Sequence, residues 1–426
     1  MALAAAMLGG VWNRRAMRRR CGNALTWVPT WVSAVIRTVV DSYPEPVDGE
    51  VLAEFVVRHV QSDPGRGPRR PRKQSGLPRV RRWYVCPPVM HARWGVPDLA
   101  TPAELARWIG VEGGKLDALA DRKGLERRVR DERLRNYRYR WIAKRSGGKR
   151  LLESPKSLLK QVQRAVLHGV IDRIPAHGAA HGFCRGRSVL SFVRPHVGAE
   201  VVVKVDLADF FLTTRGSRVL RTFRAAGYPG DVARTLTGLC TNQTPPGVGA
   251  TAGWELRARL REAHLPQGAP TSPALANLCA FGLDTRLTAL ATAVGATYTR
   301  YADDLAFSGD REFSRRAPRF LDAVGQIVME EGFAVNHRKT QVMPSSQRQR
   351  LAGVVLNGGT NIPRNEFDIL KAILHNCVRR GPAGQNRDGH ADFRAHLQGR
   401  IGWVTTLNPA RGEKLRAVFE TIVWGW

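Results

Sequence analysis

The chain has 426 residues, which is enough to bury a sizeable core and, at this length, usually means two or three domains. Its 67 Lys and Arg residues outnumber 36 Asp and Glu residues, giving a formal charge of +31, the sign that neutralises phosphate backbones. This balance favours a nucleic-acid partner, with a ribosomal-style or merely Arg-rich protein as the alternative.

Cysteine usage and the N-terminal sequence predict a cytoplasmic location without a membrane anchor. The six cysteines stand singly, with neither a CxxC pair nor the spacing of a disulfide scaffold. Near the N-terminus, arginines follow the first apolar residues, the reverse of a secretory signal. The apolar stretch Ala24–Val40 is interrupted by Arg37 before it could span a membrane, so we expect a buried or partner-facing helix there.

We expect residues 1–61 to form an N-terminal extension of unknown role. Its three tryptophans either pack a small helical domain or dock a partner. Residues 62–93 follow as a basic connector, rich in Pro, Gly and Arg and without an apolar period. This connector is either a solvated linker or a basic arm that touches RNA.

Compact structure is predicted from about Trp94. The segment Leu99–Val111 is typical of a short capped helix, and Tyr137–Leu152 predicts two strands around a Gly-containing turn. A helix is expected to begin near Ser154-Pro155 and to run with apolar residues at helical spacing as far as Ile171. Together these elements predict one lobe of sheet and helix.

A second group of elements predicts an α+β arrangement. The β-branched run Glu200–Val205 indicates a strand that ends directly in Asp206. Ser272-Pro273 opens a long helix, Thr297–Ser308 is typical of a hairpin, and a further amphipathic helix is expected to end at Gly332.

Three acidic residues stand where these strands end. Asp206 closes one strand, and Asp303 and Asp304 form the tip of the hairpin. Adjacent carboxylates flanked by apolar strand residues repel one another unless a cation compensates them. Two Mg²⁺ ions roughly 4 Å apart are what nucleotidyl transfer requires of such a cluster. An ordinary polar turn is the alternative for the Asp-Asp pair taken alone.

Four motifs in order resemble those of reverse transcriptases. Tyr301–Asp304 resembles the YxDD box, and Val205–Phe211 the first catalytic motif. Leu265–Pro273 looks like the LPQG segment and the helix after it, and Gly332–Thr340 resembles the motif with a lysine near the leaving group. The resemblance implies an α+β right-hand polymerase fold in addition to the N-terminal extension. Its parts are fingers and palm at 94–345 and a helical, RNA-binding thumb at 346–426.

The resemblance also implies roles for individual residues near the metals. Asp206, Asp303 and Asp304 match the metal ligands, joined by the carbonyl of Leu207. Lys339 matches the general acid or electrostatic partner of the departing pyrophosphate. A surface salt bridge is the alternative for Lys339.

Other residues match positions that bind the nucleotide. Phe211 matches the aromatic residue that excludes a ribose 2′-hydroxyl, although neighbouring Phe210 could hold either that role or a place in the core. Gln267 would lie against the incoming deoxynucleoside triphosphate. Lys144 and Arg150 look like fingers residues that clamp its phosphates, with solvated surface charges as the alternative.

Further motifs resemble those of retron enzymes, one of the bacterial lineages of reverse transcriptase. His181–Ser188 is similar to their HGFxxGRS segment, and Gly399–Gly412 to their thumb helices, which makes Arg400 a candidate RNA contact. Two motifs differ. Of an Asn-Ala-x-x-His motif the chain keeps only His196, which is a second candidate RNA contact with a packed histidine as the alternative. Of a Val-Thr-Gly motif it keeps only Gly353. Group II intron enzymes are the second candidate lineage, because they usually carry further maturase and endonuclease regions.

The resemblance implies an enzyme that copies its own structured noncoding RNA, starting from the 2′-hydroxyl of an internal guanosine. The product would be a branched RNA–DNA hybrid, and such systems resemble antiphage modules in which the hybrid restrains an effector protein. Two other hypotheses stay open, a diversity-generating or other bacterial polymerase and a catalytically inactive RNA-binding scaffold. The intact acidic residues argue against the scaffold.

Overall fold

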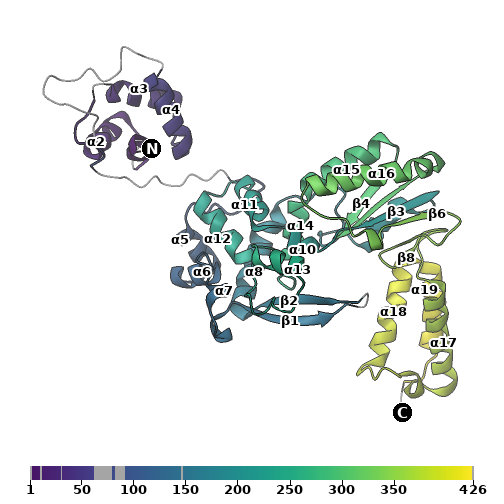
Figure 1. Ribbon diagram of the computed structural model, residues 1–426. Helices are drawn as coiled ribbons and strands as arrows, with labels where there is room; N and C mark the ends of the chain where they lie inside the picture. Colours follow the sequence, from purple (N-terminus) through teal and green to yellow (C-terminus); the bar gives the residue numbers. More distant parts are fainter. Residues whose placement is uncertain are drawn as a thin grey trace. The chain divides into compact units, whose positions relative to one another are not determined.

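The computed structural model describes residues 2–9, 12–29, 31–61, 79–81, 92–144 and 147–424 (Figure 1). Most of the connector expected at 62–93 lies outside the described residues. The chain divides into two compact units, Met1–Leu116 with Phe223–Thr235 and Asp117–Thr222 with Leu236–Trp426. Within the described parts of the chain, no helix is both long and apolar enough to cross a membrane.

The first unit begins with four helices that pack around a core drawn from their own residues. These helices are α1 (Ala2–Leu8), α2 (Arg14–Ala24), α3 (Val32–Ser42) and α4 (Gly49–Gln61). The buried guanidinium of Arg20 donates hydrogen bonds to the carbonyls of Ala6 and Met7, at the end of the very short α1. Trp12 and Trp31 pack against this core, which agrees with the small helical domain among the alternatives.

The short helix expected at 99–111 is confirmed as α5 (Pro102–Ile109). Thr101 and Glu104 form a capping box at its start, and Gly110 ends it with a φ of 80°. Four further short helices come after α5 in the chain. They are α6 (Gly113–Leu119), α7 (Leu125–Arg128), α11 (Gly216–Ala225) and α12 (Gly230–Cys240).

The second unit contains an antiparallel hairpin of β1 (Tyr137–Ala143) and β2 (Lys149–Pro155), here called the fingers hairpin. The helix expected at Ser154-Pro155 begins later, as α8 (Ser157–Gly169), so that prediction is wrong by about one turn. Alternating burial continues through residues 151, 153 and 155, because this part of the chain is still paired with β1.

Four antiparallel strands form the palm sheet in the order β4-β5-β3-β6. They are β3 (Val201–Asp206), β4 (Thr297–Tyr301), β5 (Asp304–Gly309) and β6 (Gln341–Pro344). The predicted strand and hairpin are therefore confirmed. Strand β3 is buried at every position except Lys204, which explains why its sequence is a nearly continuous apolar run rather than an alternating one.

Helices cover the palm sheet and lead into it. Helix α16 (Arg311–Glu330) packs on β3 and β5, and α15 (Phe281–Ala293) packs on β4. The single long helix expected from Ser272 is in fact two, α14 (Ser272–Cys279) and α15, because Ala280 leaves helical geometry with a ψ of 7°. The other short helices here are α9 (Val189–Val193), α10 (Phe210–Thr213) and α13 (Trp254–Arg261).

Three helices, the thumb helices, end the chain (Figure 1). They are α17 (Arg364–Arg380), α18 (Phe393–Leu407) and α19 (Pro409–Glu420), preceded by the small strands β7 (Arg350–Leu351) and β8 (Val354–Val355). Helices α18 and α19 approach so closely that a Cβ on Gly412 would lie 2.2 Å from Thr405 Oγ1. Their apolar faces share one core with β3 and β5.

Candidate active site

The three predicted acidic residues gather at one end of the palm sheet. Asp206 and Asp304 stand directly opposite each other in the register of β3 and β5. Asp303 lies in the turn before β5, and its carbonyl accepts a hydrogen bond of 2.9 Å from the amide of Leu207. The turn depends on Ala302, whose φ of 55° is in the left-handed region. Side chains from two separate parts of the sequence therefore meet at one strand end.

This strand end forms part of a cavity of about 1280 Å³. The cavity is lined by the fingers hairpin, the start of α10, the segment 266–273, the turn at 302–303 and the segment 335–339. Seven of the predicted site residues lie on its wall: Lys144, Arg150, Asp206, Phe211, Gln267, Asp303 and Lys339. Asp304 is not among the lining residues, but it stands opposite Asp206, which is. Residues predicted from distant motifs are thus brought to one place.

Nitrogen donors surround the acidic residues. Lys339 Nζ lies 3.0 Å from one carboxylate oxygen of Asp206, and Asn336 Nδ2 lies 2.9 Å from the other. Lys204 Nζ lies 2.9 Å from a carboxylate oxygen of Asp304.

The hydrogen bond to Asp206 raises the pKa of Lys339, so the ammonium keeps its proton. Burial and the neighbouring carboxylate of Asp304 raise the pKa of Asp303.

The chemistry of these side chains fits a hard divalent cation. Carboxylate oxygens are the ligands that Mg²⁺ prefers, and a cation would relieve the repulsion that raises the pKa of Asp303. As the side chains stand in the described ranges, no group of three or more His, Cys, Asp and Glu side chains is gathered closely enough to hold a metal ion, so the acidic residues would have to exchange their present partners for the cation. At this strand end, lysine and asparagine nitrogens contact the oxygens of Asp206 and Asp304 that a metal would use.

The two neighbouring phenylalanines differ in their surroundings. Phe210 is 3% exposed and packs against Phe333, with ring centroids 5.6 Å apart. Both residues line the cavity, but Phe211 is only half-buried. Phe210 therefore belongs mainly to the core, and Phe211 exposes more of its ring to the cavity.

Backbone hydrogen bonds hold the residues that were predicted to bind the nucleotide. The carbonyl of Gln267 accepts a hydrogen bond of 2.8 Å from the amide of Glu153 in β2. The amide of Lys144 donates to the carbonyl of Gly148 across the hairpin turn, and Arg150 pairs with Ile142. The fingers hairpin and the segment after His264 are thereby tied together on one side of the cavity.

His196 does not occupy the position predicted for it. Its side chain is fully buried, and its ring nitrogens lie 2.7 Å from the hydroxyls of Ser308 and Thr299. Since Thr299 Oγ1 already donates to the carbonyl of Phe192, it accepts from Nε2–H of His196, and Nδ1 accepts from Ser308. Burial lowers the pKa of His196 to about 3. The expected RNA contact is corrected to a neutral histidine in the palm core.

Arg400, the other candidate RNA contact, lies on α18 and is half-buried. It lines a hollow of about 450 Å³ with Glu366, His396 and Trp403.

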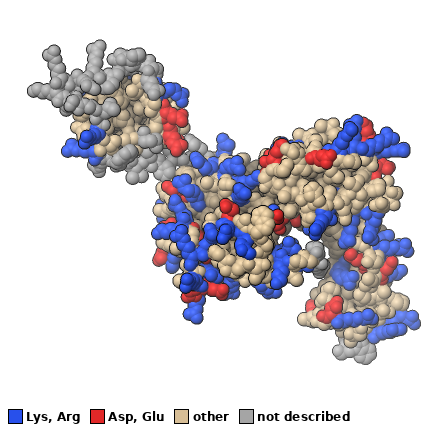
Figure 2. All heavy atoms as spheres, in the orientation of Figure 1, with Lys and Arg blue, Asp and Glu red and all other residues tan. Residues whose placement is uncertain are grey.

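Lys and Arg side chains are spread over both the palm and the thumb in the view of Figure 2, with acidic side chains in smaller groups. On the face seen in Figure 2, positive charge is therefore spread over several elements.

Sequence reasoning missed two residues that contact the acidic side chains. Lys204 could have been found, because residues two apart on a strand share a face, which puts Lys204 beside Asp206 and diagonal to Asp304. Asn336 lies in the segment already singled out for Lys339, but nothing in the local pattern indicates that it reaches Asp206.

Comparison with known proteins gives consistent findings. The family model described as "Reverse transcriptase (RNA-dependent DNA polymerase)" matches residues 142–356. The Retron Mx65 reverse transcriptase of Myxococcus xanthus is 41% identical over 331 residues, covering 76% of this chain and 72% of that protein. The Retron Mx162 reverse transcriptase of the same organism is 37% identical, covering 76% and 67%.

Among solved structures, a telomerase from Candida albicans in complex with a fragment of telomeric RNA is similar at 10% identity and a TM-score of 0.35. The match covers 63% of this chain and just over half, 54%, of that one.

Proposed function

The chain belongs to the retron reverse transcriptases, and on this premise we propose that it copies a structured noncoding RNA into a branched RNA–DNA hybrid. Membership of the family makes it an RNA-directed DNA polymerase with the right-hand fold. The proposal adds the residues that carry the reaction, the kind of template and the form of the product.

One observation carries the assignment of the catalytic residues. Asp206 and Asp304 oppose each other in register, with Asp303 in the adjoining turn, on a cavity that Lys339, Lys144 and Arg150 also border. Acidic residues that can hold cations thus stand beside basic residues that can hold phosphates. Polymerisation of nucleotides needs both in one place.

In this proposal Asp206, Asp303 and Asp304 hold two Mg²⁺ ions with the carbonyl of Leu207. When bound, the ions activate the attacking hydroxyl and neutralise charge on the departing pyrophosphate. Lys339, whose ammonium lies 3.0 Å from Asp206 and whose pKa is raised, supplies a fixed positive charge or a proton to the leaving group.

The remaining cavity residues select and orient the nucleotide. Lys144 and Arg150, at the end of the fingers hairpin, bind the triphosphate of the incoming deoxynucleotide. Gln267 lies against its base or sugar. Phe211 blocks the space that a ribose 2′-hydroxyl would need, which makes the enzyme selective for deoxynucleotides.

The RNA partner and the biological role complete the proposal. Residues 346–426 form the RNA-binding thumb, with Arg400 as one contact, and structured RNA is bound mainly through its shape, phosphates and 2′-hydroxyls. Synthesis starts from the 2′-hydroxyl of a guanosine within that RNA. The hybrid serves antiphage defence with an effector protein, in the cytoplasm. Residues 1–61 and 62–93 keep their assignment as extension and connector.

The test uses the purified protein with RNA that copurifies from its native locus, Mg²⁺ and labelled deoxynucleotides. The Asp303→Asn, Asp304→Asn double variant serves as the inactive control. Asp322→Asn, an exposed acidic residue on α16, serves as a matched control that should keep full activity. DNA covalently linked to RNA, made by the wild type and by Asp322→Asn alone, is the expected result.

Two other outcomes lead elsewhere. If only an external primer on a supplied template is extended, the polymerase assignment stands and self-priming is discarded. Absence of synthesis in both assays would favour the RNA-binding scaffold.

A further inference from the structure

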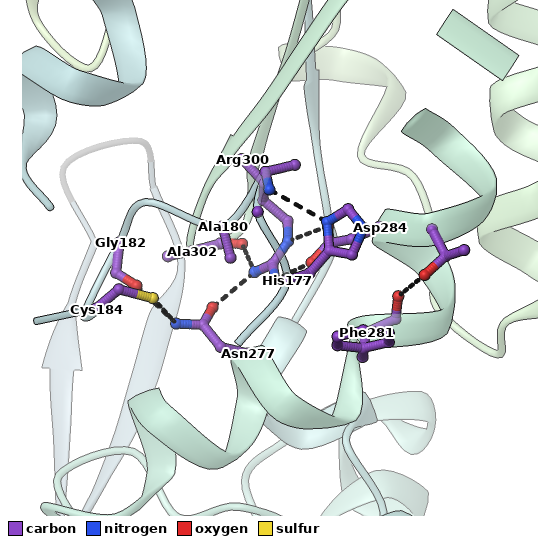
Figure 3. A network of polar contacts seen from close by, with 12 residues as sticks. His177, Ala180, Gly182, Cys184, Asn277, Phe281, Asp284, Arg300 and Ala302 are labelled. Atoms are coloured by element: carbon purple, nitrogen blue, oxygen red, sulfur yellow. Dashed lines mark hydrogen bonds and ion pairs between the residues drawn. The ribbon is translucent and has the colours of Figure 1, made fainter. Parts of the chain in front are cut away.

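Arg300 heads the largest fully buried side chains in the described parts of the chain. Its Nε and Nη2 atoms donate to the two carboxylate oxygens of Asp284 on α15, at 2.7 and 2.6 Å (Figure 3). Burial alone would lower the pKa of Arg300, but Asp284 raises it, so the guanidinium stays charged. A charged pair in the core is often no more stabilising than apolar residues of the same volume. Stability alone therefore does not account for it.

The third nitrogen of Arg300 reaches the turn that carries Asp303. Nη1 donates to the carbonyl of Ala302 at 3.1 Å and to Oδ1 of Asn277 at 2.8 Å. Ala302 holds a φ of 55°, a conformation that an alanine adopts only when its surroundings impose it. The hydrogen bond from Arg300 is one such constraint, and it acts one residue before Asp303.

Asn277 on α14 carries the network to a second backbone segment. Its Nδ2 atom donates to the carbonyl of Gly182 at 2.6 Å, while its Oδ1 accepts from Arg300. The backbone of Gly182 also lies very close to the turn at Ala302, because a Cβ on Gly182 would be 2.7 Å from the amide nitrogen of Ala302. Two further bonds of 2.7 Å join the backbone of Arg300 to Ala179 and His181. The turn is thus clamped between Arg300 and the loop around Gly182.

Both clamped segments reach the catalytic cavity. Asp303 lies on its wall from the turn, and Phe183 lies on its wall from the loop. Phe183 has a φ of 58° and is 54% exposed, with its ring 6.1 Å from that of Tyr301. A shift between the two segments would therefore move an acidic residue and an exposed aromatic ring relative to each other.

We propose that Arg300 and Asn277 are positioning residues, which fix the turn of Asp303 against the Gly182 loop and so hold the cavity wall in its working geometry. Neither side chain lines the catalytic cavity, and both act through the Ala302 and Gly182 carbonyls. The inference rests on the proposed function, because it gives Asp303 the role of a metal ligand.

Two variants disturb the clamp by different routes. Asn277→Asp keeps an oxygen to accept from Arg300 and removes the donor to Gly182. Gly182→Ala leaves the Arg300–Asp284 pair intact and pushes a methyl group against Ala302, so it carries the test if the first variant does not fold. Tyr298→Phe is the matched control, because it removes a 2.8 Å hydrogen bond to the same Asp284 and leaves the turn untouched.

The measurements are steady-state primer extension by the full-length protein with Mg²⁺, and amide hydrogen exchange read by mass spectrometry. For both clamp variants, kcat should fall roughly ten- to hundredfold, as expected for a misplacement of about 1 Å. KM for the deoxynucleotide should stay within about threefold. Exchange should quicken by about tenfold in peptides covering 180–184 and 300–304, and remain unchanged in α16. Tyr298→Phe should match the wild type in kcat, in KM and in the exchange of those two segments.

The inference is overturned if exchange in those two segments stays at the wild-type rate. It is also overturned if exchange quickens equally in α16, since the loss would then reflect general destabilisation of the palm. A wild type that is inactive on every template would count against the proposed function, and the exchange pattern by itself would then decide the clamp.

Discussion

Lys339 Nζ and a carboxylate oxygen of Asp206 lie 3.0 Å apart, between a half-exposed lysine and an almost fully buried aspartate. The contact joins the segment after α16 to the end of β3, residues 133 positions apart in sequence. Because the lysine is on the open side of the cavity, its ammonium can turn from the aspartate toward an anionic ligand without the backbone moving.

Replacing Lys339 tests this role. Lys339→Gln should lower the rate of single-turnover nucleotide incorporation by about ten- to hundredfold, because the positive charge near the leaving group is lost. Lys339→Arg should retain most of the rate. Lys160→Gln on α8, an exposed lysine away from the cavity, is the matched control. An unchanged rate in Lys339→Gln would reduce the contact to an ordinary ion pair.

Phe211→Ala should relax the choice of sugar. With the ring gone, a ribonucleotide should fit, and the ratio of kcat/KM for deoxynucleotide over ribonucleotide should fall by about tenfold or more. Competing incorporation of the two nucleotides opposite one template base measures this ratio. Phe210→Ala provides the contrast, since removing a buried phenylalanine should cost about 3–5 kcal/mol of stability and leave the ratio unaltered in whatever protein folds. A constant ratio in Phe211→Ala refutes the sugar-gate role.

The buried pair of Glu153 and His264, with 2.8 Å between Oε2 and Nε2, should make stability fall at alkaline pH. Although burial opposes it, Glu153 raises the pKa of His264 above 6.5, and His264 in turn lowers the pKa of Glu153 below 4.5. The histidine's contribution is complete below pH 6.5 and is lost as pH rises through its folded-state pKa. The glutamate's contribution is complete above pH 4.5 and is lost as pH falls through its own.

Urea unfolding of wild type and His264→Gln at several pH values above 6.5 checks this. The wild type should lose at most about 1.4 kcal/mol per pH unit relative to the variant while the histidine titrates. Parallel curves for the two proteins would mean that His264 is neutral in the folded state.

His196, unlike His264, should make the stability of the folded protein fall at acid pH. Its folded-state pKa of about 3 is below its usual 6.5, so the unfolded chain binds the proton more tightly. The contribution of this group to stability is therefore complete above pH 6.5 and shrinks by up to about 1.4 kcal/mol per pH unit as pH falls toward 3. Comparing unfolding of wild type and His196→Gln between pH 6.5 and 5 measures it, and a difference that does not vary with pH argues against a neutral buried histidine.

Local sequence was sufficient to place the acidic residues. The hairpin around Asp303 and the strand ending at Asp206 each show a strong periodic pattern beside a polar residue, and such patterns identify strands and their ends. That the two meet depends on the pairing of β3 with β5, about 100 residues apart, which the resemblance to a known family implied and periodicity did not.

What sequence could not predict are the partners of buried polar groups. For His196 the sequence left an RNA contact and a packed histidine as alternatives, and the partners that decide between them, Ser308 and Thr299, are more than 100 residues away. Arg300 is one of 67 basic residues and is distinguished only by its contacts with Asn277, Asp284 and the backbone at 179 and 181. Strong local patterns predict elements well, whereas satisfaction of a buried group depends on the whole packed structure.

The register that sets Asp206 against Asp304 also determines where the chain can change its length. One residue inserted within β3 or β5 would turn every following side chain to the other face of the sheet and carry an acidic residue away from the cavity. The segment between α17 and α18 is under no such restriction, since it pairs with no strand. Insertions and deletions among related enzymes should therefore collect between the thumb helices and be absent from the palm strands.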